Sequence, residues 1–182
     1  MLKMLGCAAL LSLTFAGAAS SATIAVNQWY GFAFSGVGKP ISEGIGITNP
    51  RNPRSISAPA GPWTFTLDRA GTLTVLDLFV SSDRFRITNF GTILGETSMN
   101  APGGTCGSDI TCGLADSSYS RGVFKLAAGD HSISGVQTAG TAGAGAFLVE
   151  VAAIPVPAAG FLLVPGLLLM AGVGRKARAK AA

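Results

Sequence analysis

The sequence predicts an all-β protein, with a single jelly-roll-like β-sandwich between a hydrophobic N-terminal segment and a hydrophobic C-terminal segment. The middle of the chain is rich in Gly, Ser, Thr and Ala, and its Phe, Val, Leu and Ile residues occur in short runs. Gly, Pro, Asn and Asp separate these runs, which is typical of strands joined by turns. No window between the two ends has the apolar period of an amphipathic helix. We therefore expect about eight short strands in two packed sheets.

The expected strands are identified by alternation of apolar and polar residues. Trp63–Leu67 alternates large apolar residues with Thr, which is the period-two pattern of a half-buried strand. In Arg84–Thr88, Phe85 and Ile87 should share one face of the strand, while both Arg side chains take the other. The remaining expected strands are residues 24–26, 29–34, 72–78, 92–94, 122–126, 131–136 and 146–151.

Residues 1–22 have the three parts of a secretory signal peptide. Lys3 precedes a short apolar run, and small residues follow that run. Ser20 and Ala22 fit the −3 and −1 positions of a cut before Thr23, with a cut three or four residues earlier as the alternative. We therefore expect export, with residues 23–153 forming the folded domain.

Residues 154–182 combine an uncharged run with a basic end. Residues 158–174 carry no charge, and with residues 154–157 the run reaches the roughly 20 residues that a membrane span needs. Pro165 lies within the run, where it would kink a helix. The basic end should stay in the cytoplasm by the positive-inside rule. The basic residues of this tail are Arg175, Lys176, Arg178 and Lys180.

This C-terminal layout resembles the PEP-CTERM class of bacterial sorting signals, and its VPLPA-CTERM variant in particular. Pro155-Val156-Pro157-Ala158 matches the Pro-x-Pro-Ala motif, whereas Ile154 and Val156 depart from the usual residues. The resemblance implies an inner-membrane-anchored precursor in a Gram-negative bacterium. An exosortase-type membrane protease would then cut near the motif and pass the protein to the cell surface or its polysaccharide matrix. The alternative is a plain single-span anchor.

A second resemblance covers residues 62–98. This segment is similar to the β-sandwich domain of exported PEP-CTERM proteins, in which two Asp residues and a Phe precede an Asn-x-Gly turn. The matching residues here are Asp77, Asp83, Phe85, Asn89 and Gly91. The resemblance implies the fold and the exported location, and it implies no activity.

The distribution of charge excludes nucleic acid as a partner. The chain has a net charge of +4 and a pI near 9.3, but five of its thirteen basic residues lie in the two end segments. Residues 23–153 hold eight basic and nine acidic residues, so the expected folded domain has a net charge of −1. A nucleic-acid-binding domain would concentrate positive charge on its folded surface.

Cys106 and Cys112 are the only cysteines outside the expected signal peptide. They lie in a Gly-rich loop, and an exported chain enters an oxidising compartment, so the pair predicts a structural disulfide. A metal site would need further ligands nearby, and a redox dithiol would normally have the C-x-x-C spacing.

Asp77 and Asp83 flank an expected loop between two strands. Two carboxylates could bind Ca²⁺ with loop carbonyls, or they could be the acid pair of a glycosidase. Asp also satisfies backbone donors in turns, and we favour this interpretation for both residues. We therefore expect no cofactor, with Ca²⁺ at these two residues as the candidate ion.

His131 and four aromatic residues are the remaining candidates for a site. His131 is the only histidine and no G-x-S-x-G nucleophile motif accompanies it, so we interpret it as a surface or turn residue. Core packing explains Trp63 better than ligand binding does, because Trp63 begins an alternating strand. The four aromatic residues that could form a sugar-stacking platform are Trp29, Tyr30, Trp63 and Tyr119.

These observations favour a non-enzymatic exported protein of the cell surface or extracellular matrix. Its expected partners are the membrane, an exosortase-type protease and extracellular polysaccharide. The alternative function is a membrane-anchored carbohydrate-binding module. A secreted hydrolase would need a compact acid or nucleophile cluster, and the sequence contains no motif for one.

Overall fold

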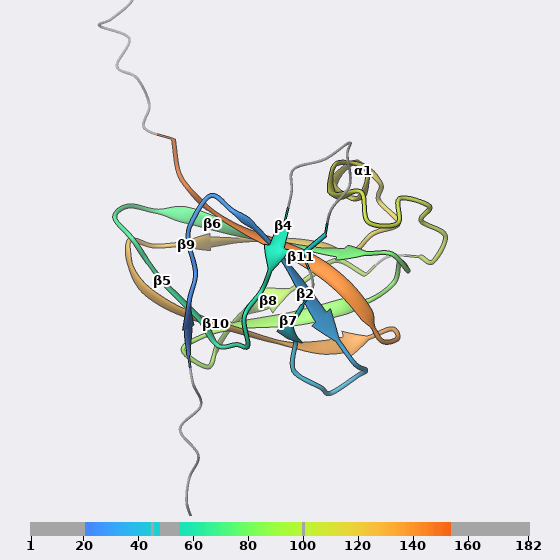
Figure 1. Ribbon diagram of the computed structural model, residues 1–182, viewed down its shortest axis with the longest axis horizontal. Coiled ribbons are helices and arrows are strands. Elements are labelled where there is room, and N and C mark those ends of the chain that lie inside the picture. Colours follow the sequence, from blue (N-terminus) through green and yellow to red (C-terminus); the bar gives the residue numbers. More distant parts are fainter. Residues whose placement is uncertain (1–20, 45, 48–54, 100, 154–182) are drawn as a thin grey trace, which may run out of the picture. The chain divides into compact units, whose positions relative to one another are not determined.

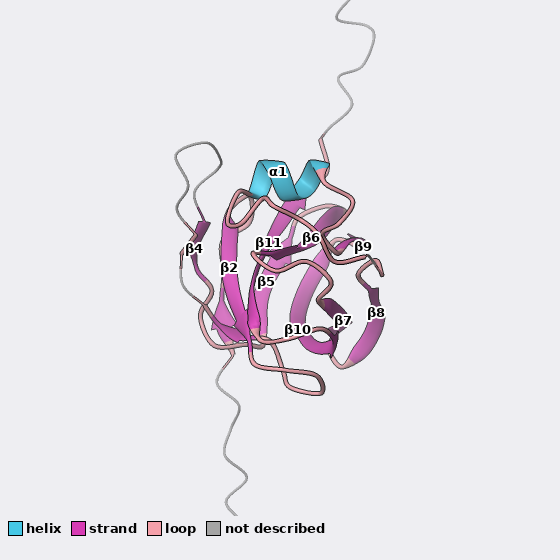
Figure 2. Ribbon diagram, turned by 90° about the vertical axis from the view of Figure 1, so that its right-hand side faces the viewer, coloured by secondary structure: helices cyan, strands magenta, loops and turns pink. Residues whose placement is uncertain are grey.

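Two β-sheets face each other in the computed structural model, which describes residues 21–44, 46–47, 55–99 and 101–153 (Figure 1). The strands provide most of the regular structure, and one short helix lies across one end of the sandwich (Figure 2). The expected all-β sandwich is therefore confirmed.

The first sheet contains five strands. In spatial order they are β1 (Ala22–Thr23), β5 (Trp63–Leu67), β10 (Gly129–Ala139), β7 (Arg84–Asn89) and β8 (Thr92–Glu96). β1 is parallel to β5, and the other neighbours are antiparallel. On the outer face, Arg84 and Arg86 of β7 both pair with Glu96 of β8, each at 2.8 Å. Phe85 and Ile87 are fully buried on the inner face, so the predicted alternation of this strand is confirmed.

The second sheet contains six strands. In order they are β3 (Ser42–Glu43), β2 (Trp29–Phe34), β11 (Gly143–Val151), β6 (Gly71–Leu78) and β9 (Arg121–Leu126), and β4 (Ser55–Ser57) pairs with β2 in parallel. Successive strands change sheet at β1–β2, β4–β5, β5–β6, β6–β7, β8–β9, β9–β10 and β10–β11. Loops that cross between the two layers therefore form both ends of the sandwich.

Aromatic side chains fill the space between the sheets. The Phe32 ring lies 5.3 Å from the Phe85 ring, and the Trp63 ring stacks on the Phe147 ring at 4.2 Å between centroids. Phe32 and Phe147 come from the second sheet, whereas Trp63 and Phe85 come from the first. Each buried ring contributes roughly 2–3 kcal/mol of hydrophobic stabilisation. These contacts between the two layers form the centre of the core.

Some elements differ from those expected. The expected strand at 24–26 is wrong, because β1 ends at Thr23, and β3 and β4 were not expected. The helix α1 (Ile110–Ala115) was also missed, because six residues are too few to show a helical period. Asp109 caps this helix by accepting a hydrogen bond from Cys112 N at 2.9 Å. Ile110 then packs with Leu76 and Leu78 in a second apolar cluster.

Most of the two expected targeting segments lie outside the described residues. The predicted cut before Thr23 falls within β1, which begins at Ala22. Within the described ranges, the structure contains no helix long and apolar enough to cross a membrane. The expected span at 158–174 lies beyond those ranges.

Candidate functional site

Asp77 and Asp83 lie at the point where the chain crosses from the second sheet to the first. Asp77 is on β6, and Asp83 immediately precedes β7. The loop between them turns with left-handed backbone at Phe79 (φ 66°) and Ser82 (φ 93°). Asp77 Oδ2 accepts a hydrogen bond from Asp83 N at 3.1 Å and so closes this turn. Both carboxyl groups are buried, with exposed fractions of 0% and 1%.

The Asp83 carboxylate joins this turn to the next crossing of the chain. Asp83 Oδ1 accepts hydrogen bonds from Gln137 Nε2 at 2.9 Å and from Thr141 N at 2.6 Å. Gln137 is a fully buried residue of β10, and its Nε2 also donates to the carbonyl oxygens of Ala139 and Thr141. We call Asp77, Asp83, Gln137 and Thr141 the acid cluster. It ties the β6–β7 loop to the β10–β11 loop at one end of the sandwich.

Gly140 allows the two loops to approach closely. Its φ of +96° lies in the left-handed region that favours glycine. A Cβ atom built on Gly140 would overlap the Asp83 carboxyl oxygen Oδ1. The acid cluster therefore depends on a glycine here for both conformation and space.

Burial changes the ionisation of both carboxyl groups. Loss of solvation, together with repulsion from Asp83, raises the pKa of Asp77 from 3.8 to about 8. Loss of solvation also raises the pKa of Asp83, against the opposing hydrogen bonds from Thr141 and Gln137. Asp77 is therefore mostly neutral at pH 7, which avoids placing two negative charges together in the interior.

The contacts of the acid cluster favour turn chemistry for the two Asp residues. Asp83 Oδ1 and Asp77 Oδ2 accept hydrogen bonds from the backbone N–H groups of loops, as Asp commonly does in turns. Within the described part of the chain, Asp77 Oδ1 and Gln137 Oε1 have no hydrogen-bond partner. Ca²⁺ takes six to eight oxygen ligands, and the described residues contain no group of three or more acidic, His or Cys side chains.

The predicted disulfide between Cys106 and Cys112 is confirmed, and the Cα atoms of the two residues are 5.5 Å apart. Tyr119 anchors the disulfide loop. Its hydroxyl oxygen accepts hydrogen bonds from Cys106 N at 3.0 Å and Gly107 N at 3.2 Å, and it donates to the Phe79 carbonyl at 3.2 Å. The disulfide loop is thus attached to the same β6–β7 loop that Asp77 closes. No local pattern could have predicted this role, because Phe79 and Tyr119 are 40 residues apart.

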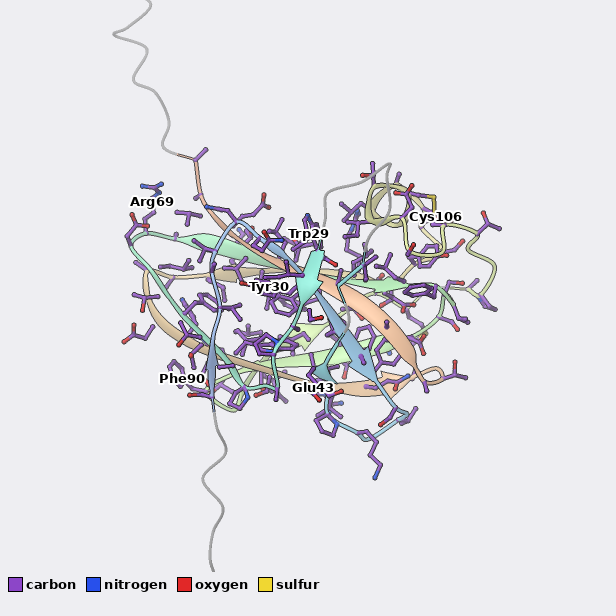
Figure 3. All side chains as sticks on the ribbon, in the orientation of Figure 1. Trp29, Tyr30, Glu43, Arg69, Phe90 and Cys106 are labelled. Atoms are coloured by element: carbon purple, nitrogen blue, oxygen red, sulfur yellow. A yellow bond between two sulfur atoms is a disulfide. The ribbon has the colours of Figure 1, made fainter. Side chains whose placement is uncertain are left out.

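The four aromatic residues considered as a sugar-stacking platform are all buried, so that interpretation is wrong. Tyr30 stacks on Phe147 at 5.2 Å, and Trp29 joins the apolar cluster beside α1. Both lie on β2, which pairs with β11 on one side and with β3 and β4 on the other, and Figure 3 labels their positions. The prediction that Trp63 is a core residue is confirmed.

His131 is also buried, which corrects the expectation of a surface or turn position. It lies on β10, where its ring stacks on Phe65 at 5.1 Å. Asn89 Nδ2 donates to His131 Nδ1 at 3.0 Å, so Nε2 carries the proton and donates to the Ala127 carbonyl at 3.0 Å. Both ring nitrogens therefore have structural partners.

The sorting motif Pro155, Val156, Pro157, Ala158 and the basic tail Arg175, Lys176, Arg178, Lys180 lie outside the described residues. The chain matches no protein-family model, no curated protein and no solved structure.

Proposed function

We propose that this chain is a non-enzymatic exported protein of the cell surface or extracellular matrix, sorted through a C-terminal exosortase-type signal. The observation that carries the proposal is the disulfide between Cys106 and Cys112. Disulfides persist mainly in oxidising compartments outside the cytosol. The pair closes a loop that Tyr119 already fastens to the sandwich, so its function is structural.

The two end segments support the proposed route. An N-terminal signal peptide would start export, and the span with its basic tail would hold an inner-membrane precursor. The motif at 155–158 would then present the precursor to the protease. The protein would finally reach the surface or the matrix, where polysaccharide is the expected partner.

The acid cluster supports a non-enzymatic role. Asp77 and Asp83 are the residues that could have formed the acid pair of a glycosidase, but both are buried and bind the protein's own loops. A glycosidase acid pair has to reach the two sides of a substrate bond. Their hydrogen bonds instead hold the β6–β7 and β10–β11 loops together.

The first experiment separates sorting from plain anchoring. Replacing Pro155 and Pro157 with Ala leaves the hydrophobicity of the tail nearly unchanged, so a plain anchor should behave as in the native chain. If the motif is a sorting signal, the double variant should remain membrane-bound and unprocessed. Cell fractionation with mass spectrometry of the C-terminus distinguishes these results, and identical maturation of both proteins would contradict the exosortase step.

The second experiment tests the tail itself. Deleting residues 154–182 should release the β domain from the membrane as a soluble exported protein, because no other uncharged run of spanning length remains after removal of the signal peptide. Neutralising the four basic residues of the tail instead should misorient the span. A deleted protein that stays in the membrane would refute both the sorting signal and the plain anchor.

The pairing of β1 with the sandwich indicates where the signal peptide is cut. Ala22 N donates to the Pro62 carbonyl at 3.0 Å, and a cut before Thr23 would remove this hydrogen bond. Cuts after Ala18 or Ala19 leave β1 complete and still place small residues at the −3 and −1 positions. We expect N-terminal mass spectrometry of the exported protein to find a chain that begins upstream of Ala22.

A further inference from the structure

An open groove lies on the β1 side of the first sheet and does not involve the acid cluster. Its volume is about 530 Å³, within the range of roughly 300–1,000 Å³ that small-molecule sites occupy. β1, β5, β10 and the turn between β7 and β8 all contribute lining residues. The groove is therefore built mainly on paired strands, which hold side chains more precisely than loops do.

Hydroxyl groups and one carboxylate provide the polar part of the lining. Thr64 and Thr66 lie two residues apart on β5 and line the groove. Thr66 Oγ1 donates a hydrogen bond to Asp130 Oδ1 at 2.6 Å. The hydroxyl oxygens of Thr23 and Thr64 are 3.4 Å apart across the β1–β5 pair. A hydroxyl can donate one hydrogen bond and accept two, so these groups retain capacity for a ligand.

Phe90 provides an apolar side to the same groove. Its side chain is 65% exposed, and Figure 3 shows it at the periphery of the domain. Phe90 and Gly91 both have positive φ, at 48° and 77°, in the hairpin turn between β7 and β8. Asn and Gly are the usual residues at such positions, and a bulky side chain there is unfavourable. Neither the turn nor the core therefore explains an exposed Phe at this position.

Hydrogen bonds of His131 and Asn89 hold the lining of the groove in place. His131 lines the groove and stacks on Phe65, and its Nδ1 accepts the hydrogen bond from Asn89. Asn89 Oδ1 also accepts from Ser132 N at 3.0 Å, and Phe90 N donates to the Ser132 carbonyl at 2.9 Å. The turn that carries Phe90 is thus attached to β10.

The chemistry of the lining identifies the class of ligand. No Lys or Arg is among the described residues that line the groove, and Asp130 is acidic, so phosphate or uronate groups would be repelled. Threonine hydroxyls and a carboxylate match the hydroxyl or amino groups of a sugar, and the Phe90 ring matches the apolar face of a pyranose. We propose that this groove binds a neutral or amino-sugar glycan. The inference rests on the proposed function, which places the domain where such glycans occur.

The test compares Phe90→Asn with a matched control in the mature exported protein. Asn tolerates the left-handed conformation, so Phe90→Asn removes the ring and keeps the turn. Ile93→Ala is the control, because Ile93 lies on the adjacent strand β8 and is 62% exposed. The probes are hexamers of glucose, N-acetylglucosamine and glucosamine, with hexagalacturonate as the acidic comparison, measured by titration calorimetry.

We expect binding to at least one of the first three hexamers, at least tenfold weaker in Phe90→Asn and unchanged in Ile93→Ala. Asp130→Asn should selectively weaken binding of the glucosamine hexamer. The inference is overturned if none of the three binds, if hexagalacturonate binds best, or if Phe90→Asn binds as the native protein does. Cell-surface labelling is read separately: labelled protein without glycan binding refutes only the groove, whereas protein retained in the cytoplasm refutes the proposed function.

Discussion

The aromatic core lies between the two sheets and the acid cluster lies at one end of the sandwich, and the two regions are held together in different ways. Phe32 contacts four other aromatic rings, which come from both layers. The acid cluster is held by directed contacts, in which Asp83 accepts hydrogen bonds from Gln137 and Thr141. The two regions adjoin, because a Cβ built on Gly143 would contact both the Phe34 ring and Asp83 Oδ2.

The aromatic core therefore provides stability to the sandwich, whereas the acid cluster determines how its loops are arranged. Packing of aromatic rings is favourable in many arrangements, so the core stabilises the sandwich without fixing how its loops cross. The hydrogen bonds that Asp83 accepts from Gln137 and Thr141 are directional, so the acid cluster requires one arrangement of the β6–β7 and β10–β11 loops. The core should therefore respond to loss of volume, and the acid cluster to pH and to loss of space.

The largest expected effect is the pH dependence carried by Asp77. Because its pKa is raised from 3.8 to about 8 in the folded protein, its stabilising contribution is complete below pH 3.8 and is lost as the pH rises through about 8. At roughly 1.4 kcal/mol per pKa unit, Asp77→Asn should be clearly more stable than the native protein at pH 8 and similar to it near pH 4. Thermal unfolding across this pH range measures the difference.

Asp68→Asn is the control for this prediction, because Asp68 is exposed. It should unfold with the same pH profile as the native protein. Parallel pH profiles for Asp77→Asn and the native protein would mean that burial does not raise the pKa of Asp77.

Phe32→Ala should destabilise the core by about 4 kcal/mol, because Phe32 is fully buried among four rings. Phe32→Leu keeps more of the volume and should cost about half as much. Unlike the effect at Asp77, both losses should be independent of pH. Urea unfolding at pH 5 and pH 8 checks the size and the pH independence together, and a cost below about 1 kcal/mol would contradict the packing.

Gly140→Ala should cost about 3 kcal/mol, because the added Cβ overlaps the Asp83 carboxyl group at a position with φ of +96°. Gly38→Ala is the matched control, since Gly38 has φ of +79° and no heavy atom within 4 Å of the added Cβ. The control isolates the conformational cost, about 1 kcal/mol. Equal urea midpoints for the two variants would show that the Asp83 carboxyl group moves aside for the added Cβ without loss of stability.

The smallest effect is expected at the disulfide. Cys112→Ser should lower the free energy of unfolding by about 2 kcal/mol, because the bridge closes only a short loop. Export should be unchanged. Thiol labelling of native protein from the cell envelope provides the companion measurement, and two free thiols there would refute the disulfide outside the cell.

Local patterns predicted much of the fold. Alternation in Trp63–Leu67 and around Phe85 identified strands that the structure confirms, because a strand exposes successive side chains to opposite faces. The two short strands β3 and β4 were missed, because two or three residues hold no pattern and pair only where β2 is already in place. The candidate residues Asp77 and Asp83 were found, while their partner Gln137 was not.

The sequence by itself determined the class of fold, the position of most strands and the pairing of the two cysteines, because each depends on neighbours along the chain. The tertiary structure alone decided which side chains meet. Asp83 contacts Gln137 and Thr141 across 54 and 58 residues, because two crossings between the sheets end at the same place. The groove likewise joins Thr64, Phe90 and Asp130 from separate elements. The order of strands within a sheet brings such residues together, and that order leaves no trace in local periodicity.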